Sequence, residues 1–121
     1  MDTAIEQALK TDNLIDITTT GRKSGKPSTI EIAIHNFDGV IYITGFPGKR
    51  DWYANLLQHP QFTLHLKEST KADLSASATP VTDAALRRQI LTQVVAKWQR
   101  EAELEAFVQA SPLVEVRIEQ V

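Results

Sequence analysis

Hydrophobic and polar residues alternate in several short stretches of the chain, which is the pattern of strands with one buried face. In the clearest case Ile30, Ile32 and Ile34 share one face of a strand. Other stretches are rich in β-branched residues, which favour strands. Together these patterns predict about six strands. We expect them at residues 14–20, 28–35, 40–44, 62–67, 72–79 and 114–119.

Three regions instead repeat apolar residues every three or four positions, as amphipathic helices do. The first follows a possible cap at Asp2 or Thr3, and the second spans residues 51–58. The third begins after Thr82, which we expect to be its N-cap, and continues to about residue 110. Trp98 lies on the apolar stripe of this third region, so we expect it in the core and not in a catalytic role.

Short turns between the strands predict antiparallel neighbours. Asp38 and Gly39 separate two strand patterns, and such a pair is a strong hairpin signal because both residues tolerate positive φ. A closed sheet buries six short strands more completely than a two-layer sandwich does. We therefore expect a mainly β, α+β fold: a small barrel with helices on its rim, formed as a single domain over residues 1–121.

Composition removes several function classes. The chain has no cysteine, which excludes disulfides, thiolate metal sites and cysteine nucleophiles. Its net charge of −2 argues against a nucleic-acid-binding protein. No apolar run approaches the ~20 residues that span a bilayer, and the first residues lack a signal-peptide pattern. We expect a cytoplasmic protein with no membrane insertion.

Basic charge is concentrated in one part of this acidic chain. Residues 18–50 carry five basic and two acidic side chains, a local surplus of +3. The segment 21–26 places Arg22, Lys23 and Ser24 in a glycine-bearing turn between two strands. Such a turn can bind phosphate or carboxylate groups, although an exposed, solvated turn has the same composition.

A second glycine-bearing segment, residues 45–56, combines two cations with an aromatic pair at a helix start. Anions favour helix N-termini, and Trp52 with Tyr53 can form the wall of a site for a planar ring. The alternative is that these aromatic residues only anchor the helix to the barrel.

The sequence contains no recognisable catalytic constellation. Its three histidines lack metal-ligand spacing, and we expect His35 and His65 to lie outward or between strands. No Gly-x-Ser-x-Gly motif is present, so a hydrolase triad is unsupported. We assign no catalytic residue and no metal ligand.

The order of these motifs resembles a known family. Residues 18–27 (TTTGRKSGKP), the Asp38–Gly39 hairpin, residues 51–56 (DWYANL) and His59–Pro60 together resemble the deazaflavin (F420)-dependent nitroreductase and quinone reductase family. The resemblance covers roughly residues 14–79. It implies a split β-barrel, a hydride carried by coenzyme F420, and a quinone, nitro compound or activated alkene as the electron acceptor. It also implies a homodimer.

The resemblance further implies which residues meet the coenzyme. Arg22, Lys23 and Ser24 would contact its phosphate and acidic tail, and residues 29–32 would line its ring. The complete set implied for the coenzyme is Arg22, Lys23, Ser24, Ser28, Thr29, Ile30, Ile32, Thr44, Gly45, Pro47, Trp52 and Tyr53. The acceptor site is expected near residues 82–112, where no residue can be assigned.

Two alternatives remain open from the sequence. The same fold could bind FMN or haem in place of the deazaflavin coenzyme. The chain could also be a non-catalytic module that stores or delivers a cofactor.

Overall fold

The computed structural model describes residues 1–119, and every structural statement below concerns these residues. In chain order the elements are α1 (Thr3–Thr11), β1 (Leu14–Thr20), β2 (Pro27–Phe37), β3 (Val40–Thr44), α2 (Asp51–Gln58), β4 (Gln61–Leu66), β5 (Ala72–Pro80), α3 (Ala84–Lys97), a 3-10 turn (Glu101–Glu103), α4 (Leu104–Ala110) and β6 (Leu113–Ile118).

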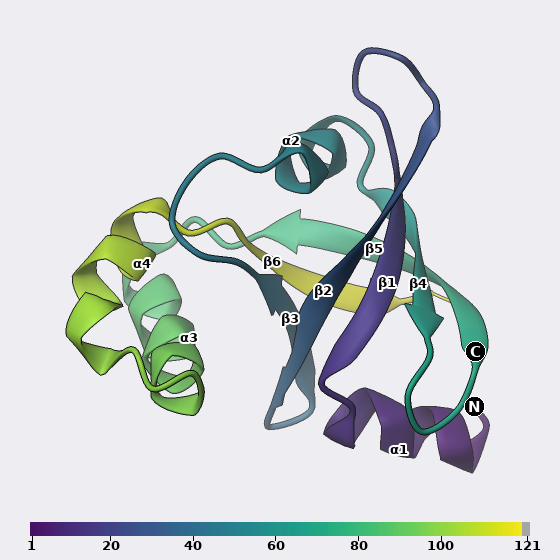
Figure 1. Cartoon of the computed structure of the whole chain (residues 1–121), viewed down its shortest axis with the longest axis horizontal. Coiled ribbons are helices and arrows are strands. Elements are labelled where there is room, and N and C mark those ends of the chain that lie inside the picture. The colour runs from purple at the N-terminus through teal and green to yellow at the C-terminus, as the bar shows by residue number, and fades with distance from the viewer. Residues whose placement is uncertain (120–121) are drawn as a thin grey trace.

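The six strands form a closed barrel in the order β1-β2-β3-β6-β5-β4. Every neighbouring pair is antiparallel, and β1 pairs with β4 to close the ring (Figure 1). Closure leaves no strand edge with unpaired backbone groups. The sequence prediction of an antiparallel barrel with helices around it is confirmed.

Strand alternation builds the barrel interior. In β1, Ile15 and Ile17 are fully buried, whereas Asp16 and Thr18, which alternate with them, are only half-buried on the outside. Helix α1 covers one end of the barrel with Ala8 and Leu9 (Figure 1). Trp52 and Leu56 of α2 join the same core.

A second apolar core lies outside the barrel, where α3 and α4 pack together beside β3 and β6 (Figure 1). Tyr42 and Leu113 contribute to it from the strands. The helices supply Ile90, Leu91, Val94, Val95 and Phe107, each at most 2% exposed. These two helices therefore have a core of their own.

Local signals in the sequence explain several boundaries. The Asp38–Gly39 hairpin forms as predicted, with φ of 56° and 85°. The predicted Thr82 cap is wrong: the N-cap of α3 is Asp83, whose carboxylate accepts a hydrogen bond from the Leu86 amide at 2.9 Å. Because α3 begins at Ala84, Leu86 is its third residue, and the amide at this position is one that an N-cap side chain satisfies. The Asp83 side chain is at the right position to reach it, whereas Thr82 is one residue too early.

His35 and His65 were both expected to lie outward or between strands, and the two outcomes differ. His65 lies on the outer face, and its Nδ1 is 2.7 Å from the Asp73 carboxylate. His35 is fully buried, so its prediction is wrong. The reason is tertiary: Trp98 at the end of α3 covers it, with ring centroids 5.3 Å apart. Trp98 itself is half-buried at the C-cap of α3.

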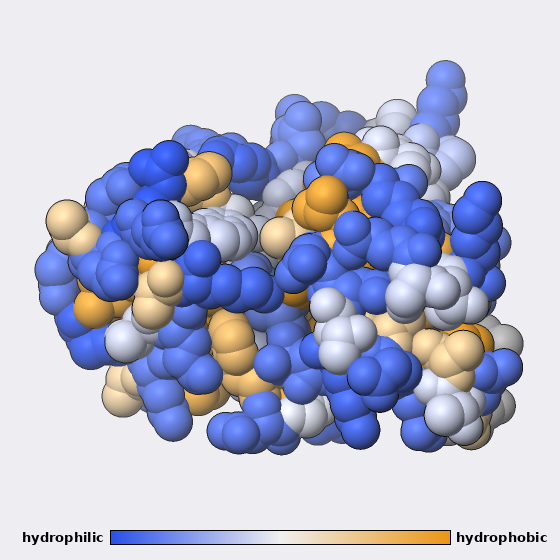
Figure 2. Space-filling model, turned by 60° about the horizontal axis from the view of Figure 1, so that its bottom comes forward, coloured by the Kyte–Doolittle hydropathy of each residue, from blue (hydrophilic) through white to orange (hydrophobic). Residues whose placement is uncertain are grey.

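The face of the molecule drawn in Figure 2 is mostly hydrophilic. On the side drawn in Figure 2, apolar residues form small separate patches among hydrophilic ones. Among the described residues, no helix combines the length and apolar character needed to cross a membrane.

Candidate functional site

The turn between β1 and β2 is held in shape by its own hydrogen bonds, and we call residues 21–28 the basic turn. The Gly21 amide donates to the Lys26 carbonyl at 2.8 Å, and Ser24 Oγ accepts from the Lys26 amide at 3.1 Å. Gly25 has a φ of 72°, which favours glycine. Lys23 is left exposed. A hollow of about 320 Å³ lies against this turn.

Helix α2 fixes the basic turn through Asn55, which is 4% exposed. Asn55 Oδ1 accepts from the Arg22 backbone amide at 3.1 Å and from its guanidinium at 3.0 Å. Asn55 Nδ2 donates to Thr19 Oγ1 at 3.1 Å. Asp51 adds an ion pair to Arg22 at 3.3 Å. The Arg22 side chain is therefore oriented before any ligand binds.

An apolar cleft of about 440 Å³ lies between β2, the end of β3 and the start of α2. Its lining residues are Ile30, Glu31, Ile32, Thr44, Gly45, Phe46, Arg50, Asp51 and Trp52. Trp52 is 7% exposed, and its ring meets that of Tyr53 edge-on at 5.9 Å. The cleft is suited to a flat, largely apolar ring.

The loop from β3 to α2, residues 45–50, lines one side of this cleft with Gly45, Phe46 and Arg50. The Arg50 guanidinium donates to the Phe46 carbonyl at 3.2 Å and to the Lys49 carbonyl at 2.8 Å. The Gly48 amide donates to the Ala110 carbonyl at 3.0 Å, which ties the loop to α4. These bonds stabilise a loop that has no regular secondary structure.

A middle hollow of about 450 Å³ adjoins both the hollow at the basic turn and the apolar cleft. It shares Arg22 with the hollow at the turn and Arg50 with the cleft, and Asp51 lines all three. Lys49 adds a further cation. A long ligand with a flat apolar end and an anionic end fits this sequence of surfaces.

The structure brings together most of the residues predicted for the coenzyme. Arg22, Lys23, Ser24 and Ser28 line the hollow at the basic turn. Ile30, Ile32, Thr44, Gly45 and Trp52 line the apolar cleft. Thr29, Pro47 and Tyr53 lie outside the linings of both. Thr29 Oγ1 instead lies 2.7 Å from Thr18 Oγ1 on the outer sheet face, and Tyr53 lines the middle hollow.

Sequence reasoning missed Asn55 and Asp51 as parts of this site. Their spacing of four residues places both on one face of α2, the face that meets Arg22. The spacing of Asp51 and Asn55 on one helix face was the only signal in the sequence that could have indicated their role. No sequence pattern states which helix face meets which turn, so the pairing itself required the fold.

Solved structures with the same fold have low sequence identity. A putative pyridoxamine 5'-phosphate oxidase from Listeria innocua has a TM-score of 0.73 at 11% identity, covering 96% of this chain and 91% of that chain. An F420-H2 dependent reductase has a TM-score of 0.63 at 18% identity, covering 88% and 95%. A structure described as a domain-swapped dimer has a TM-score of 0.66 at 19% identity, covering 88% and 81%.

No curated protein matches the chain. The family model for F420H(2)-dependent quinone reductase matches residues 1–106, which is most of the sequence and includes the basic turn, the apolar cleft and α2. The resemblance seen in the motifs is thereby confirmed, as is the split-barrel fold. The chain belongs to the F420H2-dependent quinone reductase family, and it is an oxidoreductase of that family.

Proposed function

We propose that this protein binds coenzyme F420 with its deazaflavin ring in the apolar cleft and its anionic tail at the basic turn, and that it reduces a quinone. The observation that carries the proposal is that the three hollows are neighbours, since Arg22, Arg50 and Asp51 each line more than one of them. The coenzyme tail combines a phosphate with glutamates, and charge-assisted bonds to Arg and Lys suit both groups.

When bound, the reduced coenzyme supplies the hydride. The residues of the chain bind and orient it and exclude water. Ile30, Ile32 and Trp52 offer apolar walls, and dry walls strengthen every polar interaction at the reacting ring. Arg22, fixed by Asn55 and Asp51, offers a preorganised charge for the tail. No acid, base or nucleophile from the chain is required, since the coenzyme carries the chemistry.

The proposal is tested by titrating the purified protein with F420, with FMN and with the deazaflavin nucleoside that lacks the phosphate and glutamates. We expect saturable binding of F420, weaker binding of the nucleoside, and reduction of menadione by F420H2. Binding of FMN at low micromolar concentration without binding of F420 contradicts the proposal and favours the FMN alternative.

We also propose that the protein acts as a homodimer in the cytoplasm. The solved structure described as a domain-swapped dimer supports dimer formation with this fold. Multi-angle light scattering measures the assembly directly: the chain has a mass of 13.5 kDa, so a dimer scatters with twice that mass. A monomer at micromolar concentration contradicts this part of the proposal.

A further inference from the structure

A network of polar side chains crosses the outer face of the barrel on β1, β2, β4 and β5. Strand alternation turns these side chains outward, and the register places Thr18 of β1 opposite Thr29 of β2. His65 of β4 is opposite Asp73 of β5. It lies two positions from Thr63, the residue of β4 that is opposite Thr18. The sheet therefore brings together a hydroxyl, an imidazole and a carboxylate.

Two short hydrogen bonds connect these three groups. Thr18 Oγ1 lies 2.7 Å from His65 Nε2, and His65 Nδ1 lies 2.7 Å from Asp73 Oδ1. An aspartate carboxylate at neutral pH only accepts, so Nδ1 carries the ring proton and Nε2 accepts the proton of the Thr18 hydroxyl. Thr18 has a single proton to donate, and Thr29 therefore donates its own to Thr18 Oγ1, at 2.7 Å. The Thr18 proton thus points at a base.

A hydroxyl bonded to an imidazole that a carboxylate orients is the arrangement of nucleophilic catalysis. The sequence analysis left a hydrolase triad unsupported, because no Gly-x-Ser-x-Gly motif is present. That motif describes a serine at a strand-to-helix turn, whereas this hydroxyl belongs to a threonine within a strand. Thr18 and His65 are also 47 positions apart, so only the sheet register reveals the pair.

The Thr18 hydroxyl faces space that a small molecule can enter. A hollow of about 300 Å³ is lined by Thr18 together with Thr63 and Ser75 on the neighbouring strands. The His65 side chain is 27% exposed and that of Asp73 is 76% exposed. None of the triad residues lines the three hollows proposed for the coenzyme. The cluster is therefore accessible and separate from the coenzyme groove.

The groups around Thr18 limit which substrates can react there. Strand β1 lies between β2 and β4, so its backbone amides pair with those strands and do not form an oxyanion hole. The Thr29 hydroxyl is a donor within reach of the developing oxyanion, since it already lies 2.7 Å from Thr18 Oγ1. One neutral donor stabilises an oxyanion only modestly. The substrate must therefore have a good leaving group, as aryl esters of short carboxylic acids do.

We propose that Thr18, His65 and Asp73 form a second catalytic site, which hydrolyses small aryl esters without the coenzyme. Thr18 Oγ1 attacks the ester carbonyl while His65 Nε2 takes its proton. The bond to the leaving oxygen then breaks, and His65 gives that proton to the departing phenol. Water next attacks the acyl-threonine, giving a proton to His65, and the carboxylic acid leaves as Thr18 regains its proton. Asp73 is a positioning residue that holds the imidazole in the required tautomer.

Hydrolysis of p-nitrophenyl acetate tests the proposal, because p-nitrophenolate release is followed by its colour. We expect saturable hydrolysis above the buffer rate, equal with and without F420. Thr18→Val, which removes the hydroxyl but keeps the shape, and His65→Gln should each lower kcat about 100-fold. Thr18→Ser should retain activity. Asp73→Asn should lower kcat roughly tenfold or more with KM unchanged, which a merely structural role would not produce.

The controls separate this site from reactive surface groups. Imidazoles hydrolyse aryl esters without a partner, so His59→Gln, at an exposed histidine outside the cluster, is the matched control and should keep the wild-type rate. Circular dichroism checks that each variant folds; the outward, partly exposed positions should tolerate these changes. Equal rates in Thr18→Val and the wild type overturn the proposal, because His65 or a lysine then reacts alone. A wild-type rate no higher than the buffer rate also overturns it.

Discussion

Asn55 is a single residue whose amide serves two elements, since it connects Thr19 and Arg22 to helix α2. Replacing it by leucine removes both acceptors and donors from a buried position. We expect Asn55→Leu to lower the free energy of unfolding by about 1–3 kcal/mol, the cost of leaving buried polar groups unpaired. We also expect weaker F420 binding but unchanged binding of the tail-free deazaflavin nucleoside.

Calorimetric titration of both ligands measures this difference. The control is Asn13→Leu, because the Asn13 side chain is exposed and accepts or donates no hydrogen bond among the described residues. An equal loss of affinity for F420 and for the nucleoside would show that Asn55 acts on the general fold and not on the orientation of Arg22.

Arg22 and Lys23 are the two residues proposed to bind the anionic tail of F420. We expect the double variant Arg22→Ala/Lys23→Ala to bind F420 more weakly by ~1–3 kcal/mol, the value of one or two charge-assisted hydrogen bonds. A variant with the same change in net charge, Lys10→Ala/Lys71→Ala, removes exposed cations away from the hollows and should bind normally. If Arg22→Ala/Lys23→Ala binds F420 with unchanged affinity, the basic turn is an ordinary solvated turn and does not bind the coenzyme tail.

His35 makes stability depend on pH. Burial, with a smaller effect from the Lys97 charge, lowers the pKa of His35 from 6.5 to about 4. Above pH 6.5 the imidazole is neutral in both folded and unfolded chains and contributes no pH dependence. As the pH falls from 6.5 toward 4, the unfolded chain takes up a proton that the folded chain does not, so stability decreases.

Urea denaturation at pH 7 and pH 4.5 measures this effect. We expect the His35 contribution to the loss of stability to be about 2–3 kcal/mol, from the pKa difference. A His35→Gln variant removes the titration, so its stability should fall less over the same pH range. Identical losses in the variant and the wild type contradict the assignment to His35.

At the scale of elements, the sequence predicted helix and strand bounds best where turn-forming residues directly follow the element. Strands 14–20 and 40–44 and helix 51–58 have the predicted bounds because glycine, proline or Asp-Gly pairs end them. Strand β2 runs from Pro27 to Phe37, longer than predicted, because it pairs with β1 and then with β3. Such pairing is tertiary, and strand periodicity cannot define where it stops.

The start of α3 gives an element-scale prediction. Because the Asp83 carboxylate caps the Leu86 amide, Asp83→Ala should destabilise the protein by about 1 kcal/mol. Thr82→Ala changes a hydroxyl without this bond and should cost much less. Thermal denaturation of the two variants compares them directly, and a larger loss for Thr82→Ala contradicts the cap assignment.

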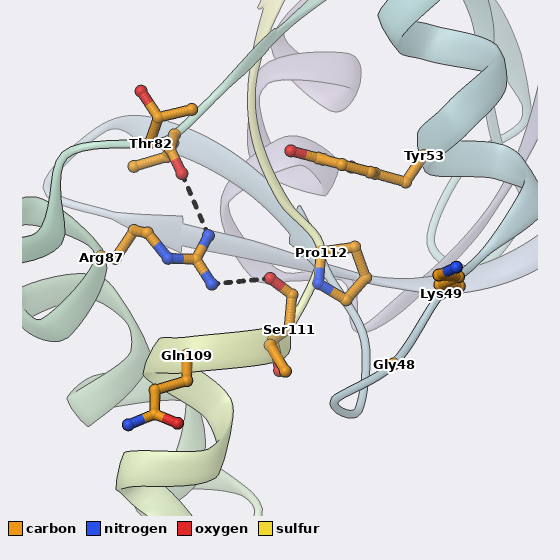
Figure 3. A pocket seen from close by; sticks show the side chains of 10 residues that line it. Gly48, Lys49, Tyr53, Thr82, Arg87, Gln109, Ser111 and Pro112 are labelled. Atoms are coloured by element: carbon orange, nitrogen blue, oxygen red, sulfur yellow. Dashed lines mark hydrogen bonds between the residues drawn. The ribbon is translucent and has the colours of Figure 1, made fainter.

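For the candidate site, too, the sequence predicted the residues of short local segments but not those that the fold brings together. The cations of the basic turn and the Trp52 wall of the cleft follow from short segments, which the sequence displays directly. Thr82, Arg87 and Gln109 line a hollow together with Tyr53 (Figure 3). The sequence could not assign these individual residues, because the fold brings them to Tyr53 from at least 29 positions further along the chain. Convergence over that separation depends on the packing of the second core.

At the scale of the whole molecule, the 45–50 loop connects the two cores. Phe46 packs against the rings of Trp98 and Phe107, with centroid distances of 5.3 and 5.8 Å, and these two rings also contact each other. The Arg100 guanidinium lies 4.8 Å from the Phe46 ring centre, within the range of a cation–π interaction. The loop that borders the apolar cleft is thus held from outside the barrel by α3 and α4.

This coupling predicts that Phe46 determines the local stability of the loop. Phe46 is 44% exposed, so Phe46→Ala should lower the free energy of unfolding by only about 1–2 kcal/mol. Loss of its aromatic contacts, each worth about 0.5–1.5 kcal/mol, should loosen the loop. The Gly48 amide, bonded to Ala110, should exchange its hydrogen roughly tenfold faster, and F420 should bind more weakly. Leu57→Ala, at a similarly exposed position, is the control. Unchanged Gly48 exchange in Phe46→Ala would mean that the barrel alone positions the loop.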